Sequence, residues 1–257
     1  MGQLANKIVV VTGASKGMGR HFVSALTSAG AQVAALARPS PELDALGQDH
    51  GAAVLPIACD VTDSQMVDAA IEQAVQHFGR IDVLVNNAAI YHPFAFESGS
   101  DAIICQHLEV NVLGVAWPIR AAIPHLRKTQ GQIVSISSES VAMPFPMLAL
   151  YAATKAAVET LSEGLRAELR SDGIRVSVLR SGSVSGGSGG QAWSEETRQA
   201  FFKKIVETGH AAMSGAPATP ESMAQALVAI LTLPRDVSVD LIELRAAQAG
   251  LPEGARG

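Results

Sequence analysis

The chain has 257 residues, of which 48% are hydrophobic and 17% charged, so it has ample material for a packed core. Its 19 basic and 24 acidic side chains give a net charge of −5, which argues against nucleic acid or an anionic membrane as a partner, because both favour basic surfaces. The two cysteines, Cys59 and Cys105, are too few for a disulfide framework, and we expect both to be buried thiols in a reducing compartment.

The chain begins with a short polar segment that runs into the apolar residues 8–11, a run too short for a secretory signal. N-terminal myristoylation is rejected, because Asn6 stands where that signal needs Ser or Thr. The longest strongly apolar stretch, residues 141–153, contains two prolines and falls short of the ~20 residues that span a bilayer. We therefore expect a cytoplasmic protein without a membrane segment.

Short β-branched runs alternate with longer amphipathic segments along most of the chain. The apolar runs predict buried parallel strands at residues 8–11, 32–37, 53–58, 81–85, 132–136 and 175–179. Helical patterns lie between them, near residues 17–29, 63–78, 102–126 and 150–169. Asp63 is placed to begin one of these helices and Gly79 to end it. The alternation predicts an α/β fold with a doubly wound parallel sheet and helices on both faces.

This alternation stops after Gly182, where residues 183–191 hold four glycines and three serines and predict a mobile loop. A polar helix is predicted at residues 193–207, a second loose stretch at 211–220, and a late helix at 221–231. This order predicts a flexible substrate lid at about residues 183–220, although composition leaves a plain surface insertion open. Residues 237–244 predict the seventh strand. With neither an internal repeat nor a linker, we expect residues 1–257 to form one domain.

A glycine-rich turn lies where the first predicted strand meets the first predicted helix, with glycine at positions 13, 17 and 19. Glycine lets the backbone approach a pyrophosphate closely, and the free N–H groups at the start of the helix attract the anion. Tight turns also use glycine for packing alone, and three residues separate Gly13 from Gly17 instead of the one in the usual dinucleotide fingerprint. The turn is thus a candidate phosphate cradle.

The spacing of these glycines, with Thr12 before them, resembles that of the short-chain dehydrogenase/reductase family. Further motifs of that family follow in order: Asp60-Val61, Asn86-Asn87-Ala88-Ala89, Asn111, Ser138, and Tyr151 with Lys155. The resemblance covers residues 7–184 and implies a Rossmann fold that binds a nicotinamide cofactor. It implies that Asp60 and Val61 flank the adenine and that Asn87 and Ala88 lie along the adenosine ribose. The residues expected to bind the cofactor are Gly13, Ser15, Lys16, Gly17, Met18, Gly19, Arg38, Asp60, Val61, Asn87, Ala88, Tyr151, Lys155, Gly182 and Val184.

The end of the second predicted strand bears on the choice of cofactor. Proteins that bind NAD generally place a carboxylate there for the ribose hydroxyls, whereas this chain has Ala37 followed by Arg38. A guanidinium can hold a 2′-phosphate through two parallel hydrogen bonds, and similar NADP-dependent enzymes use a lysine placed like Lys16 for the same phosphate. Ordinary solvated charges are the alternative. We predict NADP(H) as the cofactor, with NAD as a weaker one.

Tyr151 and Lys155 are four residues apart at the start of a predicted helix, so both side chains point from one face toward one cleft. A phenol has a pKa near ~10, but a nearby ammonium and an oxidised nicotinamide favour the phenolate, so Tyr151 can exchange a proton with a carbonyl or an alcohol. Ser138 lies at the carboxyl end of a predicted strand and can hold the substrate oxygen. The family's spacing to the tyrosine selects it over Ser135 and Ser137, and capping the strand end is its alternative role.

The resemblance implies that Asn111 holds a water behind Lys155, which completes a proton route to solvent. The alternative is that Asn111 is a buried asparagine bonded to helix backbone. The predicted reaction is hydride transfer between the nicotinamide and a carbonyl or alcohol, with Tyr151 as general acid, Ser138 as oxygen clamp, and Lys155 binding the ribose and lowering the pKa of the tyrosine. Other chemistry on the same scaffold, such as epimerisation or dehydration, or an NADP-binding regulator without catalysis, are the competing interpretations.

The expected substrate is a small molecule. Residues expected to border it are more apolar than charged and favour a hydrophobic or aromatic ketone or aldehyde: Tyr91, His92, Ser140, Val141, Met143, Phe145 and Val184. Two alternatives stay open for Glu139. It recognises an amine or hydroxyl of the substrate, or it points to solvent. The seven histidines show no metal-ligand spacing, so no metal is expected.

The chain departs from the family pattern at several positions. Ala89 replaces a glycine, Ser181-Gly182 replaces Pro-Gly, and Gly186 replaces a threonine that often bonds the carboxamide, so that Ser183, Ser185 or a lid residue takes its place. Leu241-Ile242 stand where tetrameric relatives have glycines. We nevertheless expect a homo-oligomer, either a dimer or a tetramer.

Overall fold

The computed structural model describes residues 2–186, 193–210 and 217–247. Within these residues, seven parallel strands form one sheet in the order β3-β2-β1-β4-β5-β6-β7. The strand order reverses between β1 and β4, which is where open α/β sheets bind ligands, at the carboxyl ends of the strands. The predicted doubly wound parallel sheet is therefore confirmed. The strands are β1 (Ile8–Thr12), β2 (Gln32–Ala37), β3 (Val54–Ala58), β4 (Val83–Asn86), β5 (Gln132–Ser138), β6 (Arg175–Ser181) and β7 (Leu241–Leu244).

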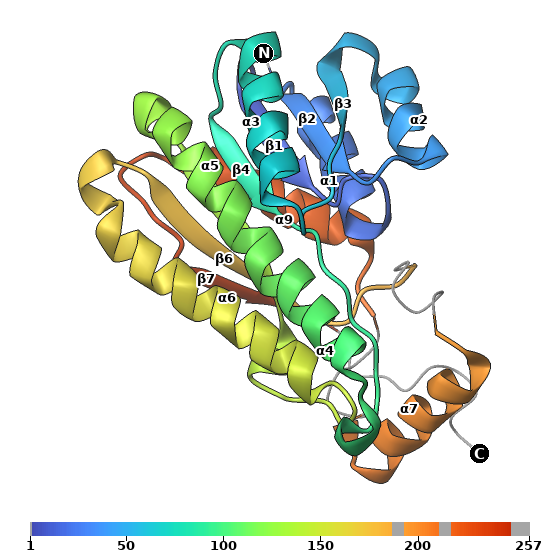
Figure 1. The fold of residues 1–257 in the computed structure, drawn as a ribbon. Coiled ribbons are helices and arrows are strands. Elements are labelled where there is room, and N and C mark those ends of the chain that lie inside the picture. The colour runs from blue at the N-terminus through green and yellow to red at the C-terminus, as the bar shows by residue number, and fades with distance from the viewer. Residues whose placement is uncertain (1, 187–192, 211–216, 248–257) are drawn as a thin grey trace.

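Helices cover both faces of this sheet (Figure 1). One face carries α1 (Gly17–Ser28), α2 (Pro41–His50) and α9 (Pro220–Thr232), and the other carries α3 (Ser64–Phe78), α5 (Gly114–Thr129) and α6 (Ala149–Glu168). Helix α4 (Asp101–Leu108) continues into α5 through a π-helical turn at Glu109–Leu113, and α7 (Glu195–Glu207) lies beyond the carboxyl edge of the sheet (Figure 1). Short 3-10 turns occur at Gly51–Ala53, Phe96–Ser98, Glu139–Val141 and Arg170–Asp172.

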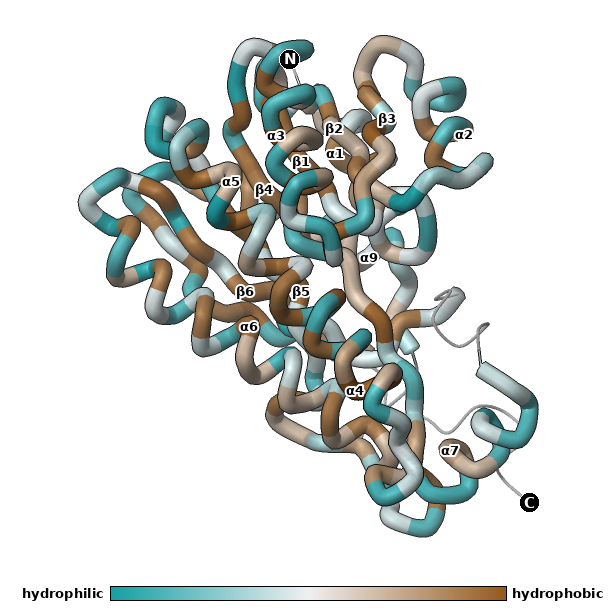
Figure 2. The backbone as a smooth tube through the Cα atoms, viewed as in Figure 1, coloured by the Kyte–Doolittle hydropathy of each residue, from teal (hydrophilic) through white to brown (hydrophobic). Residues whose placement is uncertain are grey.

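The core consists of two layers, one on each side of the sheet. Val9 and Val11 pack with the side chains of α1 and α9, whereas Val10 packs with those of α3 and α5. Successive side chains of a strand point to opposite faces, so a strand buried on both faces needs a continuous apolar run. Figure 2 shows this pattern, since the central strands are largely hydrophobic and the outer helical surfaces largely hydrophilic.

Two of the predicted helix signals are confirmed in α3. The carboxylate of Asp63 accepts hydrogen bonds from the backbone N–H groups of Gln65 and Met66, at 2.9 and 3.1 Å. Gly79 ends the helix in the left-handed conformation, with φ of +80°. Both residues satisfy backbone groups that the helix itself leaves without a partner.

Helix α2 was not among the predicted elements. Ser40 caps it, its hydroxyl accepting from the backbone N–H of Leu43, and Pro41 occupies its first turn. Only Leu43 and Leu46 of this helix are buried, so its apolar pattern is too sparse to be read as a helical face.

The seventh strand is shorter than predicted, because it begins at Leu241 and not at residue 237. The guanidinium of Arg175 donates hydrogen bonds to the carbonyls of Leu233, Pro234 and Val237. These carbonyls therefore serve the turn after α9 and are not part of the β6–β7 ladder, whose register starts at the pair Val178 and Leu241.

The predicted lid is only partly described, since residues 187–192 and 211–216 lie outside the described residues. Its first residues are held by backbone bonds: Ser185 donates to Ala218 at 2.8 Å, and Ala218 donates to Ser183 at 2.9 Å. The predicted helices on either side of the second gap correspond to α7 and α9.

The two cysteines differ in their exposure. Cys59 is buried, but Cys105, on α4, is exposed, so the expectation of two buried thiols is wrong for Cys105.

By length and composition, the helical segment Asp101–Thr129 could cross a membrane, although core helices of soluble proteins pass the same test. Its residues Val115, Ile119 and Leu126 lie in the core beneath the sheet. The absence of a membrane segment stays a prediction.

Candidate active site

The side chains predicted to be catalytic meet where the carboxyl end of β5 lies against the first turns of α6. The ammonium of Lys155 donates a hydrogen bond to the carbonyl of Ile136 at 2.8 Å and lies 5.8 Å from the ring centroid of Tyr151. The side chains of Tyr151 and Ser138 are joined by a hydrogen bond. The hydroxyl of Ser138 also accepts from the backbone N–H of Ser140, so this serine caps the strand end as well.

Burial changes the acidity of both groups on α6. It raises the pKa of Tyr151 to about 12, and the hydrogen bond with Ser138 acts against this rise. Burial lowers the pKa of Lys155 to about 8, since Lys155 is only 3% exposed. In the protein alone, Tyr151 therefore carries a proton at neutral pH, and this proton can be given to a substrate oxygen.

Asn111 lies in the π-helical turn between α4 and α5 and is fully buried. Its side-chain amide donates to the carbonyl of Ile90 at 2.9 Å and to the hydroxyl of Thr154 at 3.1 Å, and its oxygen accepts from the N–H of Ile90 at 2.8 Å. It thus ties the loop after β4 to α6, the helix that carries Tyr151 and Lys155. Its partners include loop backbone and not the helix backbone of the alternative interpretation. Its role in holding a water stays a prediction.

The glycine turn has a shape that only glycine can take. Gly13 and Gly17 have positive φ angles of 62° and 51°. A Cβ on Gly13 would lie 2.8 Å from the Cα of Ala88, and one on Gly19 would lie 2.1 Å from the carbonyl oxygen of Gly13. Lys16 precedes α1 without a side-chain cap, so the N–H groups of the first helical turn are open to an anion. Ser15 and Met18, both half-buried, complete the turn.

The ends of β1 and β4 are bonded to each other beside this turn. The hydroxyl of Thr12 accepts from the backbone N–H groups of Asn87 and Ala88, at 3.0 and 3.1 Å. The amide of Asn87 donates to the carbonyls of Thr12 and Gly13, at 2.9 and 3.1 Å. These bonds place Asn87 and Ala88 at the point where the strand order reverses, as a dinucleotide site requires.

The remaining predicted cofactor residues also lie at this edge of the sheet. Asp60, after β3, accepts from the N–H and the hydroxyl of Thr62, and Val61 is buried. Gly182, after β6, donates to the carbonyl of Leu244 at 2.8 Å, and a Cβ there would lie 3.0 Å from that oxygen. Val184 pairs with Ala218 in a single β-bridge.

Two cations lie near the carboxyl ends of β1 and β2. Arg38 is exposed and has neither an ion pair nor a side-chain hydrogen bond with the part of the chain that the structure describes. Lys16 lies 3.5 Å from a carboxylate oxygen of Glu42, on α2, and both side chains are about half exposed. Ala37, which occupies the position of the usual carboxylate, is buried.

An aromatic cluster lies beside Tyr151. The ring of Tyr91 lies 5.7 Å from that of Tyr151 and 5.2 Å from that of Trp193, whose indole N–H donates to the carbonyl of Tyr91. Trp193 in turn contacts Phe201 of α7, so that this helix covers the cluster. The prediction included Tyr91 but missed Trp193 and Phe201. Their signal in the sequence was aromatic side chains in the predicted helical segment 193–207, which also contains Phe202.

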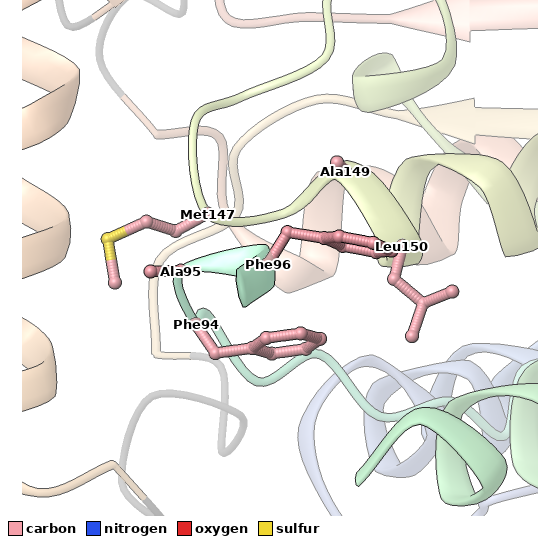
Figure 3. A pocket seen from close by; sticks show the side chains of 6 residues that line it. All are labelled: Phe94, Ala95, Phe96, Met147, Ala149 and Leu150. Atoms are coloured by element: carbon pink, nitrogen blue, oxygen red, sulfur yellow. The ribbon is translucent and has the colours of Figure 1, made fainter. Parts of the chain in front are cut away.

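The other residues predicted to border the substrate differ in their placement. Phe145 joins the aromatic cluster, whereas Ser140 and Met143 are buried in the fold. His92 lies against His107, whose Nε2 accepts from the backbone N–H of His92 at 3.2 Å. Burial, and secondly the neighbouring His107, lowers the pKa of His92. A small apolar hollow of about 70 Å³ lies next to the cluster (Figure 3), lined by Phe94, Ala95, Phe96, Met147, Ala149 and Leu150.

Comparison with known proteins places these features in context. A family model described as short chain dehydrogenase matches residues 7–197. An uncharacterized oxidoreductase of Staphylococcus saprophyticus is 38% identical over 189 residues, which are 72% of this chain and 77% of that protein. Such curated relatives are matched over 54% to 77% of their own length.

Solved structures are similar over nearly the whole chain. A 3-ketoacyl-(acyl-carrier-protein) reductase from Brucella melitensis, complexed with NADH, has a TM-score of 0.83 and 27% identity, covering 96% of this chain and 99% of that one. An alcohol dehydrogenase from Thermococcus sibiricus, complexed with 5-hydroxy-NADP, has a TM-score of 0.79 and 28% identity, covering 94% and 97%. Neighbours of this fold therefore bind nicotinamide cofactors of both kinds.

Proposed function

The chain belongs to the short-chain dehydrogenase/reductase family, and we propose that it is an NADP(H)-dependent enzyme that interconverts a carbonyl and a secondary alcohol. The observation that carries this proposal is the meeting of Ser138, Tyr151 and Lys155 at the carboxyl edge of the sheet. A cofactor-binding protein without catalysis has no need for a buried phenol bonded to a serine beside an ammonium.

Each of these side chains has a definite role in the proposed reaction. When bound, the nicotinamide supplies the hydride that reaches the carbonyl carbon. The phenol of Tyr151 gives its proton to the carbonyl oxygen, and the hydroxyl of Ser138 holds that oxygen by a hydrogen bond. The ammonium of Lys155 binds the ribose and, as a positive charge near the phenol, stabilises the phenolate that is left.

The preference for NADP(H) rests on charge at the ends of β1 and β2. The described residues offer no partner to the guanidinium of Arg38, which is therefore available for a 2′-phosphate. No carboxylate stands at Ala37 to accept the ribose hydroxyls or to repel the phosphate. Gly13 and Gly17, with the uncapped start of α1, fit the pyrophosphate.

The substrate class follows from the surroundings of Tyr151. The aromatic cluster presents the rings of Tyr91, Phe145 and Trp193 beside the phenol. A hydrophobic or aromatic ketone or aldehyde would pack against such rings while its oxygen reaches Ser138. We also propose that the protein acts in the cytoplasm and as a homo-oligomer.

The direct test follows the loss of NADPH absorbance with a panel of aliphatic and aromatic ketones and aldehydes. We expect turnover with apolar carbonyls and a loss of at least about 10³-fold in kcat for Tyr151→Phe, which removes the proton donor alone. Thr232→Val is the control, because it removes an exposed hydroxyl at the end of α9, away from the carboxyl edge of the sheet. Full turnover by Tyr151→Phe would refute the mechanism.

A further inference from the structure

A chain of ion pairs crosses the carboxyl ends of β6 and β7 behind the catalytic residues. The guanidinium of Arg180 donates to both carboxylate oxygens of Glu159, at 2.9 and 2.6 Å, and to Glu243 at 2.8 Å. The side chains of Arg180 and Glu159 are only 15% and 14% exposed, so water screens this pair weakly. A bidentate, partly buried pair has a fixed geometry that an exposed pair lacks.

Glu159 also reaches the strand that carries the catalytic serine. The buried hydroxyl of Ser137 donates to Glu159 at 2.6 Å. Glu159 is four residues after Lys155 on α6, so the two side chains lie on the same face of that helix.

Three consecutive residues of β5 are therefore fastened to α6. Ile136 accepts from Lys155, Ser137 donates to Glu159, and Ser138 is bonded to Tyr151. Of these three attachments, the first and the third involve groups that the proposed reaction uses, whereas the attachment of Ser137 to Glu159 does not.

The far end of the chain of ion pairs lies at Glu139, the residue that follows Ser138. Arg245, which follows β7, pairs with Glu243 and lies 3.8 Å from a carboxylate oxygen of Glu139. Glu139 is the residue after Ser138 and is almost fully buried. The ion pairs thus join α6, β6, β7 and the end of β5, which neighbour one another in the fold (Figure 1).

We infer that Glu159, held in place by Arg180, is a positioning residue that keeps α6 on the end of β5 and thereby fixes Tyr151 against Ser138. This inference rests on the proposed function, since it concerns the geometry of the same reaction. When the ammonium of Lys155 also binds the cofactor ribose, its bond to Ile136 is weakened. The attachment of Glu159 to Ser137 then still holds α6 against β5. Errors of about 1 Å in such a geometry can cost about 10²-fold in rate.

Three single variants, one of them a control, test the inference in the full-length protein. Glu159→Ala is expected to lower kcat by about 10²-fold while the dissociation constant for NADPH stays within about twofold. Glu163→Ala, an exposed glutamate one turn further along α6, is the matched control and is expected to keep the parent's kcat. Because Glu159→Ala leaves Arg180 with one partner fewer, Ser137→Ala serves as the milder variant, and it is expected to lower kcat several-fold without changing the melting temperature.

A double variant separates positioning from a purely structural role. If Glu159 acts through the serine, adding Glu159→Ala to Ser138→Ala costs little further activity, whereas independent effects would multiply and would overturn the inference. A crystal structure of Glu159→Ala should show the hydrogen bond between Ser138 and Tyr151 broken. An unchanged bond overturns the inference even if the parent shows no turnover, and an inactive parent overturns only the proposed function.

Discussion

At the β5 end of the carboxyl edge, the side chains proposed for catalysis are bonded to the protein and largely withdrawn from water. At the β2 end of the same edge, the two cations proposed for the cofactor phosphate face solvent. Lys155 is 3% exposed and bonded to Ile136, whereas Lys16 is about half exposed and, among the described residues, pairs with Glu42. The two lysines have the same chemistry and opposite surroundings.

This difference follows from what each end has to do. Proton transfer depends on distances within a few tenths of an ångström, so the catalytic end is held by buried hydrogen bonds even in the protein alone. A phosphate brings its own charge and is attracted over several ångströms, so the cofactor end needs accessible cations more than fixed ones. We therefore expect substitutions at the catalytic end to change kcat or stability, and those at the cofactor end to change cofactor affinity.

A large loss of kcat is expected at Ser138. Ser138→Ala removes the hydroxyl that holds the substrate oxygen and should lower kcat by about 10²- to 10³-fold with little change in the KM for NADPH. The hydrogen bond with Ser138 lowers the pKa of Tyr151, so the alkaline limb of the pH profile should move to higher pH. Steady-state kinetics from pH 6 upward measures both. Ser135→Ala, three residues earlier in β5, is the control, and equal losses in the two variants would contradict the assignment.

A substitution at Arg38 should act on the cofactor alone. Arg38→Asp replaces a phosphate-binding cation with a carboxylate suited to ribose hydroxyls, so the KM for NADPH should rise by about 10²-fold and the use of NADH should improve. Kinetics with both cofactors measures the switch. Arg170→Asp changes the net charge equally at the opposite edge of the sheet and should leave the preference unaltered. An unchanged preference in Arg38→Asp would remove the charge argument for NADP(H).

The buried ammonium of Lys155 is expected to lower the free energy of unfolding at neutral pH. Burial lowers its pKa to about 8 from the ordinary 10.5, so the folded protein carries a disfavoured charge, in full below pH 8 and not at all above about pH 10.5. Lys155→Met should therefore abolish activity yet stabilise the fold by about 2 kcal/mol at pH 7, allowing for the lost hydrogen bond. The gain should shrink as the pH rises from 8 to 10.5.

Chemical denaturation at several pH values measures this effect. Lys128→Met, at an exposed lysine near the end of α5, should change stability little at any of them. A loss of stability in Lys155→Met at pH 7 would mean that the ammonium stabilises the fold, contrary to the argument from burial.

The smallest effect is expected at Glu42. Its carboxylate lies 3.5 Å from the Lys16 ammonium and competes with a phosphate for it, so Glu42→Gln should tighten NADPH binding about twofold at low salt. The gain should vanish at high salt, because both groups are exposed, and NADH binding should not change. Fluorescence titration measures it, with Glu97→Gln as a remote control. Equal changes for NADPH and NADH would show that Lys16 does not meet the 2′-phosphate.

Local sequence signals predicted most of the sheet and its helices correctly. Strand β1 is a run of five β-branched residues, and α3 is bounded by Asp63 and Gly79, so backbone preference and burial agree there. Where these signals disagree, prediction failed. Helix α2 has Ser40 and Pro41 as start signals but only two buried side chains, and the seventh strand was extended over residues whose carbonyls Arg175 occupies.

Motif spacing, together with the resemblance to a known family, likewise pointed to Ser138, Tyr151 and Lys155. The sequence by itself determined the doubly wound sheet and the glycine turn, because periodicity and spacing are local properties, and it gave the prediction that these three residues are catalytic. Only the tertiary structure decided what surrounds them. The aromatic cover of Trp193 and Phe201 and the ion pairs of Glu159, Arg180 and Glu243 join residues up to about a hundred positions apart, and no local pattern specifies which distant charges or rings will meet.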